Sequence, residues 1–72
     1  MERKEAIALL KELVDNNLAQ PSLVILQEKS RGKFELQMKD ECDNEALRDF
    51  LTKKNFGMKQ DTEKGYCVIY KP

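Results

Sequence analysis

The segment KDECDNEALRDF, residues 39–50, places Cys42 among acidic residues at the predicted start of a helix. The reactive form of cysteine is the thiolate, so the chemistry available to Cys42 depends on its pKa. A helix N-terminus lowers a thiol pKa, whereas the neighbouring carboxylates of Asp40, Glu41 and Asp43 raise it by disfavouring a further negative charge. No Lys, Arg or His adjoins Cys42, so the pattern favours an ordinary, unreactive thiol.

The residue types that several other sites require are missing. The chain has no histidine, which excludes a Ser-His or Cys-His nucleophile pair and a four-ligand Cys/His zinc site. Its three glycines are too widely spaced for a phosphate-binding loop. The acidic segment 40–45 lacks the sixth-position glycine of a calcium-binding EF-hand loop. We therefore expect no catalytic centre, no metal site and no cofactor.

A basic cluster, Lys29, Arg31 and Lys33, lies in KSRGK, where Gly32 predicts a hairpin turn. Such a turn can contact phosphate in a nucleic acid or in a small ligand. The chain carries 13 basic and 13 acidic residues, and this zero net charge argues against a nucleic-acid partner. The simpler interpretation is a solvated turn whose charges discourage pairing between sheet edges. Nucleic-acid or phosphate binding is retained as an alternative function.

Two amphipathic helices are expected. The first spans residues 3–16, and the second runs from an N-cap at Asp43 to about Asn55, with Gly57 closing it. The apolar stripe of the first helix consists of Ala6, Ile7, Leu10, Leu13 and Val14. The stripe of the second consists of Ala46, Leu47, Phe50 and Leu51.

Two hairpins follow these helices. Strands are expected at 22–29 and 33–40, and again at MKQD (58–61) and YCVIYK (66–71). The order αββαββ predicts an α+β fold, a two-layer sandwich in which two helices cover one face of a four-stranded sheet. All 72 residues form one domain, with two degenerate αββ repeats at about 3–40 and 43–71, because a shift of 38 residues aligns Leu9 with Leu47 and Leu13 with Leu51.

Two of the strands are apolar on both faces. In SLVIL, Val24 and Leu26 oppose Leu23 and Ile25, and the last strand alternates in the same way. The helices can cover only one sheet face, so we expect a second copy of the chain, or another protein, to cover the other. The predicted interaction surface consists of Val24, Leu26, Tyr66, Val68 and Tyr70.

The chain has no apolar run of the roughly 20 residues that a membrane span requires. The segment MERKEAIALLKELV is charged and then amphipathic, unlike a signal peptide. We therefore expect no membrane partner and a cytoplasmic location, in which both cysteines are reduced.

The segment from Phe34 to Lys71 resembles the second half of the SirA/TusA-type sulfur-carrier proteins in its element order and hydrophobic pattern. The resemblance implies a two-layer α/β sandwich and a family in which a cysteine carries sulfur. A thiol or sulfur-carrier-like role for Cys42 is retained as a further alternative function. The Cys-Pro motif of that family opens its first helix, whereas the first helix here opens with ERKEA and the chain has no Cys-Pro. No functional residue is therefore carried over. The leading expectation is a small, non-enzymatic cytoplasmic protein-interaction or accessory domain that self-associates.

Overall fold

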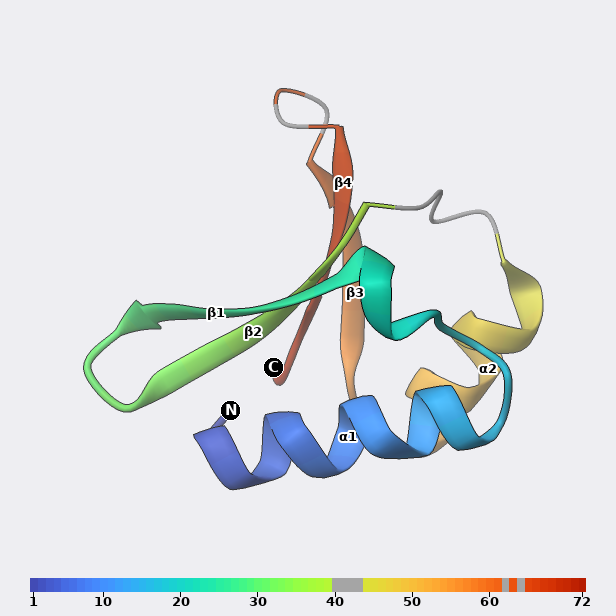
Figure 1. Cartoon of the computed structure of the whole chain (residues 1–72), viewed down its shortest axis with the longest axis horizontal. Coiled ribbons are helices and arrows are strands. Elements are labelled where there is room, and N and C mark those ends of the chain that lie inside the picture. The colour runs from blue at the N-terminus through green and yellow to red at the C-terminus, as the bar shows by residue number, and fades with distance from the viewer. Residues whose placement is uncertain (40–43, 62, 64) are drawn as a thin grey trace.

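The computed structural model describes residues 1–39, 44–61, 63 and 65–72. The helices and strands follow in the order αββαββ, as predicted, and make an α+β fold (Figure 1). The helices are α1 (Arg3–Asp15) and α2 (Glu45–Lys53), and the strands are β1 (Val24–Ser30), β2 (Lys33–Met38), β3 (Gly57–Asp61) and β4 (Tyr66–Tyr70). Neither helix of the described part is long and apolar enough to cross a membrane.

The four strands form one antiparallel sheet in the order β1-β2-β4-β3, with β1 and β3 at its edges. Alternation along the two central strands points one set of side chains at the helices. That set packs with the buried side chains of both helices in a single core, so α1 and α2 cover the same face of the sheet (Figure 1). The core consists of Ala6, Leu9, Leu13, Leu36, Met38, Leu47, Leu51, Cys67 and Ile69.

The buried stripe of α1 differs from the predicted one. Ala6, Leu9 and Leu13 are buried, whereas Ile7 is 43% exposed and Leu10 is only half-buried. Residues one position apart differ by about 100° around a helix, so the apolar arc of α1 is wide enough to be centred in two ways. The buried stripe of α1 is centred on the side that includes Leu9, so the apolar flank with Ile7 and Leu10 lies near the surface.

The boundaries of α2 also differ. Its N-cap is Asn44, whose side-chain Oδ1 accepts a hydrogen bond of 3.1 Å from the Leu47 N–H. The predicted N-cap, Asp43, lies outside the described residues. At the other end, Gly57 does not close the helix but begins β3, and Asn55 (φ 65°) makes the left-handed turn.

The two helices end in the same way, 38 residues apart in the chain. The Leu18 N–H donates to the Leu13 carbonyl and the Phe56 N–H to the Leu51 carbonyl, each at 2.8 Å. Asn17 (φ 58°) takes the left-handed conformation that Asn55 takes in the second half. This six-to-one bond with a left-handed residue is the Schellman arrangement, and it occurs at two positions that the shift of 38 residues aligns.

The sheet has a matching local symmetry. The ladder between β2 and β4 is centred on the pair Gln37 and Val68, with Leu36 opposite Ile69 on one side and Met38 opposite Cys67 on the other. A pseudo-two-fold axis through that pair therefore relates β2 to β4 and the edge strand β1 to the edge strand β3. The two αββ units consequently offer corresponding positions that can be compared within one chain.

The first hairpin turns at Gly32 (φ 77°), as expected, and its register shifts between Glu28 and Ser30 at a bulge. Strand β1 begins later than predicted because Pro21–Leu23 forms a short 3-10 turn.

Candidate interaction surfaces

The predicted interaction surface is divided between the two faces of the sheet. Val24 and Leu26 are half-buried and pack against the core, because their β2 partners Met38 and Leu36 face the helices. Alternation places Tyr66, Val68 and Tyr70 of β4 on the outer face. The five residues therefore do not form one surface, and the expectation that Val24 and Leu26 lie beside the tyrosines is wrong.

The outer face is closed by its own side chains. Val68 is 3% exposed, and its cross-strand neighbours are Gln37 of β2 and Lys59 of β3. The Lys59 Nζ lies 5.3 Å from the centre of the Tyr70 ring, a cation-π arrangement. Buried Gln37 donates to Glu35, which also pairs with Lys29. This face is thus mainly polar, and it does not present the uncovered apolar surface that the sequence suggested.

The Tyr70 ring lies against Gly57 on the neighbouring edge strand, where a Cβ would come within 2.5 Å of its Cζ. We expect Gly57→Ala to lower the free energy of unfolding by about 1–3 kcal/mol, since the ring must move from its packed position. In a Tyr70→Ala background the same change should be nearly neutral. A double-mutant cycle measured by chemical denaturation checks this, and equal costs in both backgrounds would contradict the contact.

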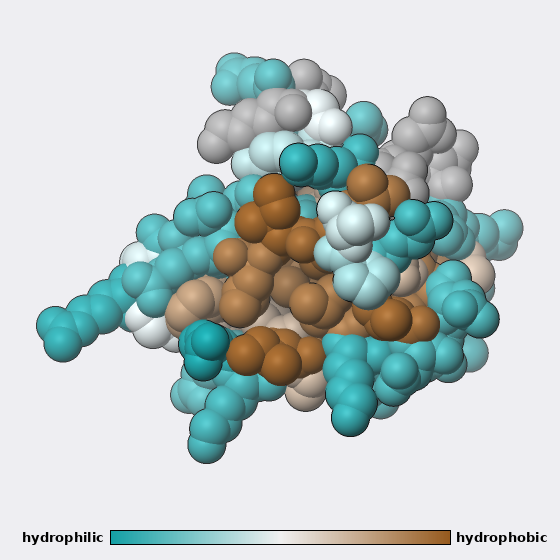
Figure 2. Space-filling model, in the orientation of Figure 1, coloured by the Kyte–Doolittle hydropathy of each residue, from teal (hydrophilic) through white to brown (hydrophobic). Residues whose placement is uncertain are grey.

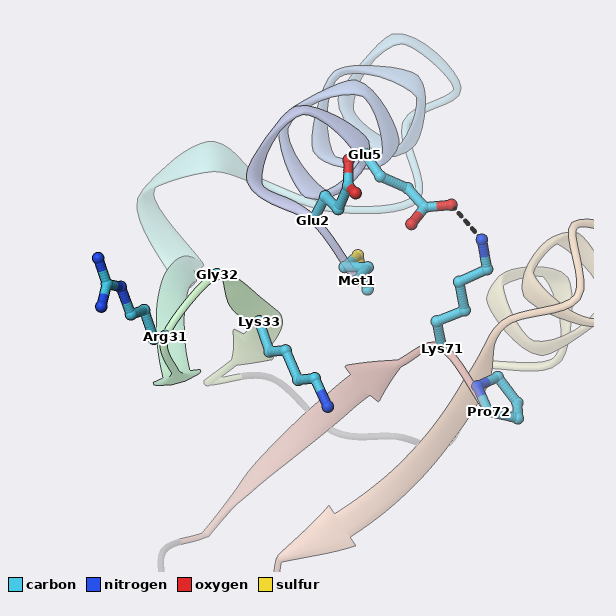
Figure 3. Close-up of a pocket in the computed structure, with 8 residues that line it drawn as sticks. All are labelled: Met1, Glu2, Glu5, Arg31, Gly32, Lys33, Lys71 and Pro72. Atoms are coloured by element: carbon cyan, nitrogen blue, oxygen red, sulfur yellow. Dashed lines mark hydrogen bonds and ion pairs between the residues drawn. The ribbon is translucent and has the colours of Figure 1, made fainter.

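The basic cluster is also dispersed. Lys29 pairs with Glu35 at 3.4 Å on the outer face, whereas Arg31 and Lys33 border an open hollow of about 810 Å³ (Figure 3). The remaining residues around the hollow are Met1, Glu2, Glu5, Gly32, Lys71 and Pro72. In Figure 3, Arg31 points away from the other side chains of the hollow. The three basic residues therefore do not converge on one site.

The charges of the hollow are mixed. Lys71 Nζ donates to Glu5 Oε2 at 2.7 Å, and this hydrogen bond lowers the pKa of the Glu5 carboxyl below its ordinary value. Glu2 adds a second carboxylate to the same hollow. An incoming phosphate would meet these acids as well as the basic side chains, so the arrangement gives little support to an anion site.

Cys67 is 2% exposed within the core and is disulfide-bonded. The expectation that both cysteines are reduced is therefore wrong for Cys67. The chain has one other cysteine, Cys42, which lies outside the described residues. A thiol role for Cys42 stays a prediction. Over residues 1–39, 44–61, 63 and 65–72, no group of three or more His, Cys, Asp or Glu side chains could hold a metal ion.

An apolar surface that sequence reasoning missed lies along one flank of α1. Ile7, Leu10 and Val14 are spaced three and four residues apart, so they form a second stripe beside the buried one. The opposite flank of α1 is polar, and its Glu5 and Glu12 pair with Lys71 and Lys54. Because Lys71 follows β4 and Lys54 follows α2, the apolar flank of α1 faces the side of the sheet where β1 lies.

Edge strand β1 continues this surface. Val24 and Leu26 are half-buried on the helix side of β1, which is an edge strand of the sheet formed by the described residues. Figure 2 shows apolar side chains gathered over α1 and β1 on this side of the molecule. We call the set Ile7, Leu10, Val14, Val24 and Leu26 the α1–β1 patch.

The second αββ unit provides an internal comparison for this patch. The residues 38 positions after Ile7, Leu10 and Val14 are Glu45, Arg48 and Thr52, and all three are exposed. The pseudo-two-fold axis relates Leu36 of β2 to Cys67 of β4. Leu26 pairs with Leu36 and Gln60 pairs with Cys67, so Gln60 is the counterpart of Leu26 on β3. The fold therefore accepts polar residues at these positions. Aligning the two helices with the shift of 38 would have revealed the α1 part of the patch, Ile7, Leu10 and Val14, from the sequence.

No protein-family model, curated protein or solved structure matches this chain.

Proposed function

We propose that this chain is a small, non-enzymatic protein-interaction domain that self-associates through the α1–β1 patch. One observation carries the proposal: at four of the five patch positions, those of Ile7, Leu10, Val14 and Leu26, the equivalent edge of the same fold is polar, and only the counterpart of Val24, Met58, is apolar. Apolar side chains near the surface lose contact with water only when a partner covers them. The contrast between the two edges is explained if only the α1–β1 edge is covered.

The size of the domain supports the same proposal. A chain of 72 residues buries a smaller share of its surface than a larger domain does, so its single core gives limited stability. Self-association adds buried apolar area without lengthening the chain. Leu10, Val24 and Leu26 already touch the core, so a partner that covers them would extend the existing core.

The test compares lysine substitutions at corresponding positions of the two halves. We expect the wild-type chain to show a mass that rises toward a dimer over about a hundredfold concentration range in sedimentation velocity. Ile7→Lys should weaken this association about tenfold or more, because a charge would be buried in an apolar contact. Glu45→Lys, at the equivalent exposed position of α2, is the control and should associate like the wild type.

A monomer at every concentration would contradict self-association. Equal weakening by Ile7→Lys and Glu45→Lys would contradict the choice of surface. The circular dichroism spectrum of each variant shows whether the fold is kept, and both positions are exposed, so neither change removes a core side chain.

The cytoplasm is the compartment proposed from the sequence. The disulfide of Cys67 counts against it, because disulfides persist mainly in oxidising compartments. Nucleic-acid or phosphate binding remains the alternative function, and no arrangement of Lys29, Arg31 and Lys33 favours it over protein binding.

A further inference from the structure

The strand pairing shows which residues of β1 direct their backbone groups toward β2 and which direct them away from the sheet. The Lys39 N–H donates to the Leu23 carbonyl at 2.9 Å, so this carbonyl points toward β2, while the Leu23 N–H donates to the Gln20 carbonyl. In an antiparallel ladder this orientation alternates from residue to residue. Ile25 and Gln27 therefore bond toward β2, whereas Leu26 and Glu28 direct their N–H and C=O groups away from the sheet. The Val24 carbonyl also points away from the sheet, but the Val24 N–H donates to the Pro21 carbonyl.

The two edges of the sheet differ in the polarity of their exposed side chains. On β3, the exposed residues Lys59 and Gln60 make the edge polar, which is a common protection against pairing with another strand. The position on β1 that corresponds to Lys59 is Ile25, which is 41% exposed on the outer face. The stretch Val24–Leu26 carries no charge, so β1 lacks this protection where its apolar residues lie.

We propose that the partner in the self-association is a second copy of this chain whose β1 pairs antiparallel with the first β1. The two-fold axis passes beside Ile25 and joins the two four-stranded sheets into one continuous sheet. This inference rests on the proposed function, because it names the occupant of the α1–β1 patch. It also states which backbone groups meet.

The alternating direction of the backbone groups along β1 is compatible with this register. A two-fold axis at Ile25 places Val24 opposite Leu26 of the second copy, so the outward Leu26 N–H of each copy donates to the Val24 carbonyl of the other, while the Val24 N–H keeps its bond to the Pro21 carbonyl. The two Ile25 residues then form a pair without hydrogen bonds, the type in which side chains approach most closely. The pairing covers the one large apolar side chain exposed on the described sheet surface.

The helix side of the sheet also fits. A two-fold axis perpendicular to the sheet keeps both α1 helices on the same face, so their apolar flanks meet over the joined strands. The pairing directs the basic turn around Arg31 of each copy toward the segment between α1 and β1 of the other. There α1 ends with no basic residue in its last turn, and the negative end of its dipole attracts a cation. This charge complementarity favours a second copy as the occupant.

Lysine substitution on β1 tests the pairing. Ile25→Lys, which gives β1 the side chain that β3 has at Lys59, should weaken dimerisation of the full chain about tenfold or more in sedimentation velocity. Gln60→Lys adds the same charge to the other edge and should leave the dimer intact. Ile25 lies outside the core, so the variant should keep the circular dichroism spectrum of the wild type.

A cysteine pair tests the register. With Ile25→Cys, mild oxidation should give a covalent dimer through the introduced thiols, because a pair without hydrogen bonds brings its Cβ atoms close together. Gln27→Cys lies on the same face of the same strand and should give none, since its neighbour across the axis is Leu23. Peptide mapping by mass spectrometry identifies the linked residues.

The outcomes separate this inference from the proposed function. If Ile7→Lys abolishes the dimer while Ile25→Lys does not, self-association through the patch stands and the β1 pairing is overturned. If the wild-type chain is a monomer throughout, both are overturned. A covalent dimer with Gln27→Cys but not with Ile25→Cys overturns the register.

Discussion

Leu36→Ala is expected to lower the free energy of unfolding by about 3 kcal/mol, within the range measured for truncation of fully buried leucines. Leu36 is 0% exposed at the middle of central strand β2, between Leu26 of β1 and Ile69 of β4. Its side chain belongs to the core that the sheet forms with the helices, and the paired backbone cannot collapse into the cavity. A domain of this size has only roughly 4–11 kcal/mol of stability in total.

The control for this variant is Leu23→Ala, which makes the same chemical change at a half-buried residue. Removing a side chain that water already reaches should cost about 1 kcal/mol. Urea titrations of both variants, followed by circular dichroism at low protein concentration, give the two values. Equal losses at Leu23 and Leu36 would show that the core is not centred where the structure places it.

Reduction of the disulfide at Cys67 is expected to lower the free energy of unfolding by about 2–4 kcal/mol. A disulfide limits the conformations of the unfolded chain, so reduction stabilises the unfolded state relative to the folded one. The reduced Cys67 thiol still packs as a small apolar side chain in the core. Most of the effect should therefore come from the unfolded chain.

The measurement is a pair of urea titrations with and without a thiol reductant. The matched variant is Cys67→Ala, which cannot form the disulfide and should unfold at the same urea concentration under both conditions. If the reductant also leaves the unfolding urea concentration of the wild-type chain unchanged, this result would contradict a stabilising disulfide at Cys67.

The order of helices and strands was predictable because local signals agreed with one another. Alternation of Phe34, Leu36 and Met38 marked a strand with one buried face, and Gly32 marked its turn. The helix ends at Asn17 and Asn55 also followed from residue type, since asparagine tolerates the left-handed conformation. These features depend on neighbours in the chain.

The choice between neighbouring apolar residues was not predictable from local pattern. Periodicity allows either Ile7 or Leu9 to lie near the centre of the α1 stripe, and the position of the sheet decides for Leu9. Likewise, Asp43 and Asn44 are both good capping residues, and only the path of the chain selects Asn44.

The candidate surface was mispredicted for a related reason. An apolar residue on the outer face, such as Val68, was taken to require a partner. A central strand has neighbours on both sides, and long side chains from those neighbours bury Val68 without another layer. Val24 and Leu26 lie on an edge strand, where such cover is available from one side only. Strand order, which the sequence does not give, decided both cases.

The position of the β2–β4 ladder has a consequence for the rate of folding. The pairs β1–β2 and β3–β4 are hairpins that close over a few residues, whereas Gln37 must find Val68 across the whole of α2 and β3. Closing that long loop costs chain entropy before any contact compensates for it. The transition state for folding should therefore lie where the two αββ units join at the middle of the sheet. Substitutions where β2 and β4 join should mainly change the folding rate, whereas substitutions in the outer hairpin turns should mainly change the unfolding rate.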